Sequence, residues 1–221
     1  MTHMDWKIRK QAEIALGNSL YKHAEALDLG FTVIDTCIDR LSIKVSPEAK
    51  VISLVAAKGK CLSIACYSLA LDGLAQESGA VLRVLLESVE LLEYLQGDLT
   101  RIERAIEGSL PSAGEIAKAI DGKFYDLRKL LNDSASHVSV DYQSMLHLVD
   151  FRLGQVRKEL IFDEKTLGVN LGTLAVFILG LAVWANVCTN KIMKETDQDV
   201  TDRLSKLHRS IEIVRSESRG V

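Results

Sequence analysis

The sequence contains little proline and few aromatic residues. Only 2 of its 221 residues are proline, and aromatic residues make up 5% of the chain. A β-sandwich or β-barrel needs turn residues at short intervals and aromatic side chains on its strand faces, so both classes are disfavoured. Apolar residues reach 48%, which is enough to bury a substantial core and argues against intrinsic disorder.

The chain also lacks an excess of basic charge. It has 27 Lys and Arg against 30 Asp and Glu, for a formal net charge of −3. A protein that coats nucleic acid needs many phosphate-binding cations, and the only short basic runs are 7–10 and 128–129. Leu, Ala, Glu, Lys and Arg dominate instead, which is typical of a mainly helical protein.

The four cysteines form no C-x-x-C pair. Cys37, Cys61, Cys66 and Cys188 all lie among apolar residues, so we predict buried free thiols rather than a zinc site or a disulfide framework. Free thiols are typical of a reducing cytoplasm. The first residues contain no apolar signal-peptide region. We therefore expect a cytoplasmic protein.

Hydrophobic periodicity and capping signals predict the helices. Ser46-Pro47-Glu48 combines an N-cap hydroxyl, a first-turn proline and an acid, and Ser112 with Glu115 forms a capping box. Residues 133–144 are polar and β-branched, which indicates a loop. The predicted helices are 5–43 (one helix, or two with a break at Gly30), 47–73, 76–97, a short one from Ser112, 123–132, 167–192 and 198–217.

The segment Leu167 to Asn190 has no charged residue and is long enough to cross a bilayer. A helix at the centre of a bundle is apolar on every face for a different reason, because each face meets another helix. Neither a second span nor an aromatic belt supports a membrane location. We interpret the segment as a central buried helix and keep a membrane anchor as the alternative.

The C-terminal segment 198–217 is a charged helix with a single apolar stripe. Such a stripe docks on the body of the protein or on a second subunit, and a homodimer is one expected use of it. Taken together, the elements predict one all-α domain over 1–221, a multi-helix bundle with a central apolar helix and a peripheral C-terminal helix. The stripe consists of Val200, Leu204, Leu207, Ile211 and Val214.

A narrow polar stripe interrupts the apolar surface of the helix at 76–97. Arg83, Glu87, Glu90 and Tyr94 are separated by four, three and four residues, so each contacts the next. Unpaired charge in a protein interior costs several kcal/mol, and Glu87 is within reach of Arg83. Two interpretations remain open: an internal ion pair that fixes helix register, or a functional cleft.

A dense polar cluster surrounds His137. Imidazole titrates near neutrality and can act as an acid or a base, while Asn and Ser side chains orient it or bind phosphate oxygens. The alternative is a helix C-cap. No G-x-S-x-G elbow is present, and the spacing of Asp133, His137 and His147 fits no zinc pattern, so we expect neither metal nor cofactor. The cluster contains Tyr125, Arg128, Asn132, Asp133, Ser134, Ser136 and His137.

These segments resemble a set of bacterial helical proteins of unknown function, over about residues 50–190. The resemblance rests on Leu69-x-x-x-Gly73-x-x-x-Glu77, Leu82-Arg83-x-x-x-Glu87, Tyr125 and Ser134-x-x-His137. That set is similar in turn to the HEPN superfamily. HEPN proteins are helical bundles that often act as metal-independent ribonucleases in toxin–antitoxin and phage-defence systems.

The resemblance implies roles for particular residues. HEPN ribonucleases carry Arg, a polar residue, about four further residues and then His; Asn132 and His137 match, and Leu131 stands where the arginine is expected. His137 would be the general base, with Arg83 or Arg128 supplying the cation. HEPN dimers often bring two such motifs together, which implies a homodimer.

Three functional hypotheses follow. The first, favoured by the missing motif arginine and the acidic net charge, is a non-catalytic binding or regulatory module of a defence or toxin–antitoxin system, with a protein partner. The second is a ribonuclease with RNA as its substrate, and the third is a membrane-anchored helical protein. The expected site residues are His137, Arg83, Glu87 and Arg128, with Tyr94, Tyr125, Asn132, Asp133, Ser134 and Ser136 around them.

Overall fold

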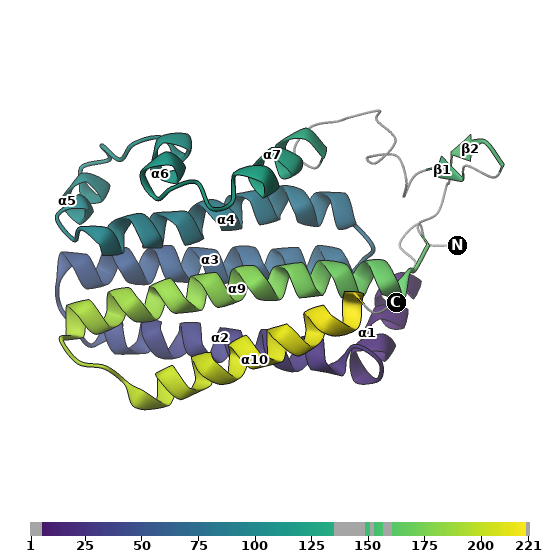
Figure 1. The fold of residues 1–221 in the computed structure, drawn as a ribbon, viewed down its shortest axis with the longest axis horizontal. Helices are drawn as coiled ribbons and strands as arrows, with labels where there is room; N and C mark the ends of the chain where they lie inside the picture. The colour runs from purple at the N-terminus through teal and green to yellow at the C-terminus, as the bar shows by residue number, and fades with distance from the viewer. Residues whose placement is uncertain (1–5, 135–148, 151–152, 157–160, 220–221) are drawn as a thin grey trace.

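The computed structural model describes residues 6–134, 149–150, 153–156 and 161–219. In this part of the chain nine helices and one two-stranded antiparallel hairpin are present, which confirms the predicted all-α class (Figure 1). The elements are α1 (Lys7–Gly17), α2 (Tyr21–Ser42), α3 (Pro47–Leu71), α4 (Ala75–Gly97), α5 (Arg101–Ile106), α6 (Ala113–Ala119), α7 (Tyr125–Ser134), β1 (Val149–Asp150), β2 (Gln155–Val156), α9 (Glu164–Met193) and α10 (Gln198–Arg219).

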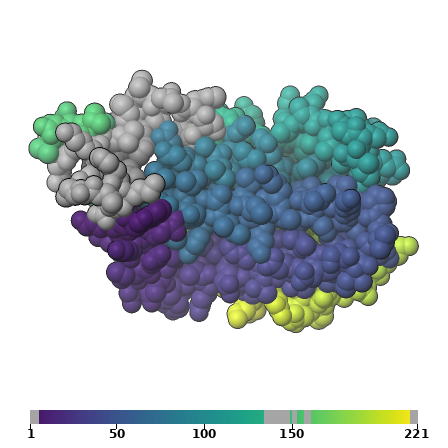
Figure 2. Space-filling view, turned by 180° about the vertical axis from the view of Figure 1, so that it is seen from behind, coloured from purple at the N-terminus to yellow at the C-terminus, as the bar shows by residue number. Residues whose placement is uncertain are grey.

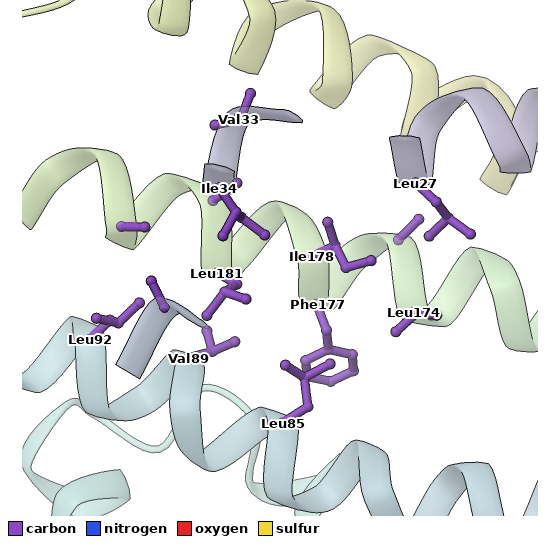
Figure 3. Close-up of a cluster of buried hydrophobic side chains, with 14 of the residues drawn as sticks. Leu27, Val33, Ile34, Leu85, Val89, Leu92, Leu174, Phe177, Ile178 and Leu181 are labelled. Atoms are coloured by element: carbon purple, nitrogen blue, oxygen red, sulfur yellow. The ribbon is translucent and has the colours of Figure 1, made fainter. Parts of the chain in front are cut away.

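Helix α9 lies at the centre of the bundle and packs against α2, α3, α4 and α10. Figure 3 shows its side chains between those of α2 and α4. Leu171, Ile178 and Leu181 are fully buried, and Phe177 is 2% exposed. The predicted central apolar helix is therefore confirmed, and its apolarity follows from having helices on most of its sides.

The local start and stop signals act as predicted. The Ser46 hydroxyl accepts a hydrogen bond from the Ala49 amide at 3.2 Å, and the Ser112–Glu115 capping box begins α6. Gly73 follows α3 with φ of +76°, a conformation that glycine adopts without strain. The six-residue α5 and the hairpin were not predicted, because elements this short carry no readable periodicity.

Neither alternative predicted for residues 5–43, one helix or two with a break at Gly30, is correct. Helix α2 continues through Gly30, and the chain breaks earlier, between the end of α1 at Gly17 and the start of α2 at Tyr21. A Cβ atom at Gly30 would clash with Cγ2 of Ile178. The glycine therefore permits the close approach of α2 and α9 and does not end a helix. Similarly, the predicted start of a loop at residue 133 is wrong, because α7 extends to Ser134.

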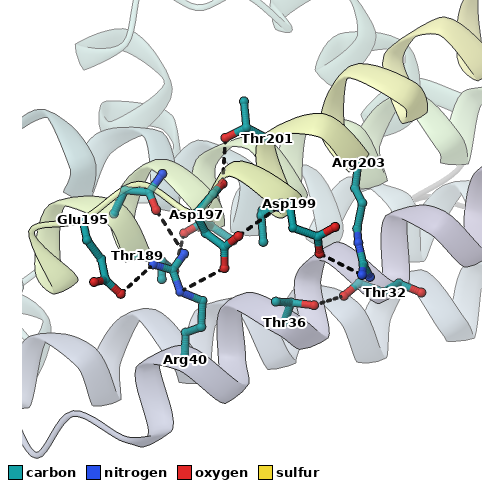
Figure 4. A network of polar contacts seen from close by, with 12 residues as sticks. Thr32, Thr36, Arg40, Thr189, Glu195, Asp197, Asp199, Thr201 and Arg203 are labelled. Atoms are coloured by element: carbon teal, nitrogen blue, oxygen red, sulfur yellow. Dashed lines mark hydrogen bonds and ion pairs between the residues drawn. The ribbon is translucent and has the colours of Figure 1, made fainter.

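The apolar stripe of α10 packs on α2 and α9 of its own chain. Val200, Leu207 and Val214 are fully buried. Arg40 of α2 contacts the chain just before α10 (Figure 4). Its guanidinium lies 3.1 Å from Oδ1 of Asn190, 3.4 Å from a Glu195 carboxylate oxygen and 3.7 Å from an Asp197 carboxylate oxygen. Of the two predicted uses of this stripe, the structure shows docking on the body.

Among the residues that the structure describes, two helices are long and apolar enough to span a membrane by length and composition, where the sequence indicated only α9. The most apolar 18-residue window is 61% buried in α9 and 33% buried in α3.

The four cysteines differ in burial. Cys37, Cys66 and Cys188 are buried, whereas Cys61 is exposed, so its predicted burial is wrong. Cys61 lies on the side of α3 that points away from the bundle core.

Candidate functional site

The polar stripe of α4 meets α7. Leu131 is 7% exposed and Leu127 is partly buried, and these two side chains fix α7 on the core. Arg128 and Asn132 each follow one of these leucines, so both are carried to the same edge of α4. An arginine at position 131 would place its charge in the apolar contact, which accounts physically for the leucine there.

Arg128 is the centre of the polar contact, and it joins two carboxylates of α4. Its Nη1 lies 3.5 Å from Oε1 of Glu87, and its Nη2 pairs with Oε2 of Glu90. The Arg128 side chain is 14% exposed, and that of Glu90 is 2% exposed. Glu90 is thus a buried carboxylate whose charge is balanced by a residue from a separate helix.

Arg83 occupies the more open end of this contact. Its Nη1 lies 3.6 Å from Oε1 of Glu87, which confirms the predicted ion pair, and donates a hydrogen bond to Oδ1 of Asn132 at 3.2 Å. The Arg83 and Glu87 side chains are 34% and 28% exposed. We refer to Arg83, Glu87, Glu90, Arg128 and Asn132 as the α4–α7 cluster.

Burial sets the protonation behaviour of the cluster. Desolvation raises the pKa of Glu90, and the charges of Glu87 and Glu93 act in the same direction. Arg128 opposes this rise through its charge and its hydrogen bond. The net result is a pKa of Glu90 above its ordinary value, because desolvation outweighs the stabilisation of the charged form by Arg128.

Tyr94 lies outside the cluster, although the sequence placed it on the same stripe. It is 5% exposed, the Arg101 guanidinium lies 4.1 Å from its ring centroid, and Arg101 donates to its carbonyl oxygen at 2.7 Å. Tyr94 is separated from the cluster because it lies one turn beyond Glu90, where the chain leading into α5 covers α4.

A second ion pair extends the contact, and the sequence interpretation missed it. Lys123, just before α7, lies 2.5 Å from Oε1 of Glu93, and its ammonium is 5.7 Å from the ring centroid of Trp184. Glu93 follows Glu90 by three residues, so the helical spacing carried the signal. Three acids of α4 therefore face basic residues from the segment that covers them.

The remaining predicted residues divide between the outer side of α7 and the undescribed segment. Tyr125 is 69% exposed, and Asp133 is also exposed. Ser134 is the last residue of α7, but its side chain, together with Ser136 and His137, lies outside the described residues. Convergence of His137 with Arg83 and Glu87 therefore stays a prediction.

Within the described residues, no group of three or more His, Cys, Asp or Glu side chains could hold a metal ion. Comparison with protein-family models finds no matching family. Searches of curated proteins and of solved structures find no match either.

Proposed function

We propose that the protein is a non-catalytic helical binding and regulatory module, and that a protein partner contacts the exposed end of the α4–α7 cluster. The observation that carries the proposal is the pairing of both arginines with groups of the protein itself. Arg128 binds Glu87 and Glu90, and Arg83 binds Glu87 and Asn132. Arg128, which is nearly buried between two carboxylates, is a poor phosphate clamp.

The two arginines differ in how easily they can change partners. Drawing Arg128 away would leave Glu90 charged and buried, and breaking a buried pair of this kind costs about 3–5 kcal/mol. The Arg83–Glu87 pair is about one-third exposed, and such pairs contribute roughly 1 kcal/mol or less. A partner can therefore engage Arg83 and Glu87 while Arg128 and Glu90 keep α7 in place.

The biological setting is proposed from the resemblance described above. A cytoplasmic regulator in a phage-defence or toxin–antitoxin system would use such a surface to hold or release a partner protein. Holding and then releasing a partner requires a binding interaction of only a few kcal/mol. Exposed ion pairs and neighbouring apolar side chains together supply an interaction of that size. On the outer side of α7, Tyr125 and Leu130 are exposed apolar candidates for that role.

The direct test compares cleavage and binding in the same preparations. Purified full-length protein and the His137→Ala variant are incubated with total RNA, and we expect no cleavage by either. Partner capture from the native host is then measured for Arg83→Ala and for the exposed control Lys129→Ala. We expect capture to be lost in the first variant and kept in the second; equal capture by both variants contradicts the proposal.

A metal-independent ribonuclease is the second candidate, because one observation favours it. Asn132 matches the polar residue of the HEPN motif, and Arg83 lies 3.2 Å from its side-chain oxygen. A cation from α4 is thus close to the position where Leu131 replaces the motif arginine. RNA cleavage that disappears in both His137→Ala and Arg83→Ala would establish this function instead.

A further inference from the structure

Helix α7 lies on the outside of the bundle and is held mainly by α4. Among the described residues, α9 packs against four long helices, whereas the principal neighbour of α7 is α4. Figure 1 shows α7 on the side of α4 that faces away from α2 and α10. In Figure 2 the blue surfaces of α3 and α4 face the viewer, and the teal chain that follows α4 lies along the upper edge. The contacts among α2, α3, α4 and α9 therefore do not depend on α7.

The apolar contact beneath α7 is small. It consists of Leu131, which is 7% exposed, the partly buried Leu127, and Phe124, whose ring centroid lies 5.7 Å from that of Phe177 in α9. Isolated helices shorter than about 12–15 residues are marginal in water. The 10 residues of α7 are therefore helical because they are docked, so that leaving α4 and losing the helix are one local event.

The ion pairs of this segment all join it to α4. Arg128 pairs with Glu87 and Glu90, and Lys123 pairs with Glu93. Removing Arg128 alone leaves Glu90 buried without its partner, which is unfavourable. Lifting the whole segment removes the cover of Glu90 together with its partner, so both charges reach water. The segment is thus able to leave α4 as a unit, although its side chains cannot leave one at a time.

The chain enters this segment through two successive residues in the left-handed region. Asp121 has φ of +65° and Gly122 has φ of +59°. Glycine adopts this conformation without strain, whereas aspartate prefers the right-handed region. Opening lets Asp121 relax, and short connections at the ends of helices are where proteins absorb hinge motions. These two residues are therefore suited to act as a hinge.

We propose that residues 123–134 form a strap that opens from α4 about Asp121 and Gly122 while α2, α3, α4 and α9 stay folded. The structure described above is the closed form. Opening exposes the three acids of α4 and separates the side chain of Asn132 from that of Arg83. The opening does not depend on the function proposed above. Its consequence, that a partner binds only the closed form, rests on that function.

Hydrogen exchange of the full chain, followed by mass spectrometry, tests the opening. We expect the amides of residues 128–134 to exchange at least about tenfold faster than those of residues 85–95 in α4, because they become exposed without unfolding of the bundle. Equal exchange rates in the two segments would show that α7 opens only when the whole protein unfolds, which overturns the proposal.

The variant Arg128→Met tests which contact keeps the strap closed. We expect exchange of residues 128–134 to become about tenfold faster still, with no change in α9. Lys129→Met is the matched control, because it removes the same charge at the next residue, which is exposed. Equal exchange in the two variants, or an equal rise in α9, contradicts the strap.

Partner capture and hydrogen exchange separate this proposal from the function proposed above. Capture that Arg83→Ala abolishes, together with no local opening of α7, supports the function and refutes the strap. Local opening of α7, together with capture that Arg83→Ala leaves unchanged, supports the strap and refutes the function.

Discussion

Helices α3 and α9 are both apolar enough to span a membrane, yet they lie in different surroundings. Helix α9 has neighbours on several sides, whereas α3 contacts α4, α9 and α2 on one side and exposes Leu54 and Ile64 on the other. Apolar composition therefore indicates that a helix face will be covered, but not what covers it. In α9 most of the cover is the rest of the chain, whereas Leu54 and Ile64 of α3 stay exposed.

The largest effect should come from truncating the centre of the bundle. Phe177→Ala removes a side chain that is 2% exposed, so we expect a loss of about 3–5 kcal/mol in the free energy of unfolding. Leu54→Ala, on the exposed side of α3, should change it by about 0.5 kcal/mol or less in the monomer. Urea unfolding at low protein concentration measures both, and equal losses would contradict the difference between the two helices.

Substitutions on the two sides of α3 should differ in their effect on the free energy of unfolding, by less than the first comparison. A Cβ atom at Gly59 would lie 2.7 Å from Cδ1 of Leu181 in α9, so Gly59→Val should destabilise the protein by about 1–3 kcal/mol through overpacking. The same final residue at Ala57, which is only half-buried, should cost about 0.5 kcal/mol or less. Thermal unfolding of the two variants provides the comparison.

The contact between α4 and α7 depends on charged side chains, unlike the apolar contacts of α3 and α9. Burial raises the pKa of Glu90 above its unfolded value, so the folded state holds this proton more tightly. The contribution of Glu90 to stability is therefore fully present below its unfolded pKa and decreases as pH rises towards its folded pKa. Glu90→Gln lacks this titration.

We expect the difference in unfolding free energy to shift in favour of Glu90→Gln as pH rises from about 4 to 7, by less than the effect of Gly59→Val. Denaturant unfolding at several pH values measures it. Glu103→Gln is a suitable control, because it makes the same substitution at an exposed residue of α5. A pH-independent difference for Glu90→Gln would show that the raised pKa does not contribute to stability.

The smallest effect on stability concerns the two cysteines of α3. Cys61 is exposed, whereas burial raises the pKa of Cys66 to about 12 and keeps that thiol protonated at neutral pH. A thiol reagent should therefore modify one cysteine of the native protein rapidly, and Cys61→Ser should remove that reaction while changing stability by about 0.5 kcal/mol or less. Rapid modification of Cys66 would show that the inner side of α3 opens to solvent.

Part of the candidate site could be predicted, because helical spacing is a local property. Arg83 and Glu87 are one turn apart, and the structure shows their ion pair. The pairing of Arg128 with Glu90 could not be deduced, since these residues are 38 positions apart and many helix arrangements would separate them. For Tyr94 the helical spacing predicted its position on the stripe, but not its contact. Arg101 of α5 lies over its ring, which the sequence could not show.

The sequence by itself determined the helical class, the caps at Ser46 and Ser112, and the central position of α9. These features depend on residues adjacent in the chain or on the uniform apolarity of one segment. Only the tertiary structure decided that Gly30 is a packing contact and not a break, that α10 docks on its own chain, and that one side of α3 stays open. Packing decides such features because it depends on shapes and charges brought together from distant parts of the chain.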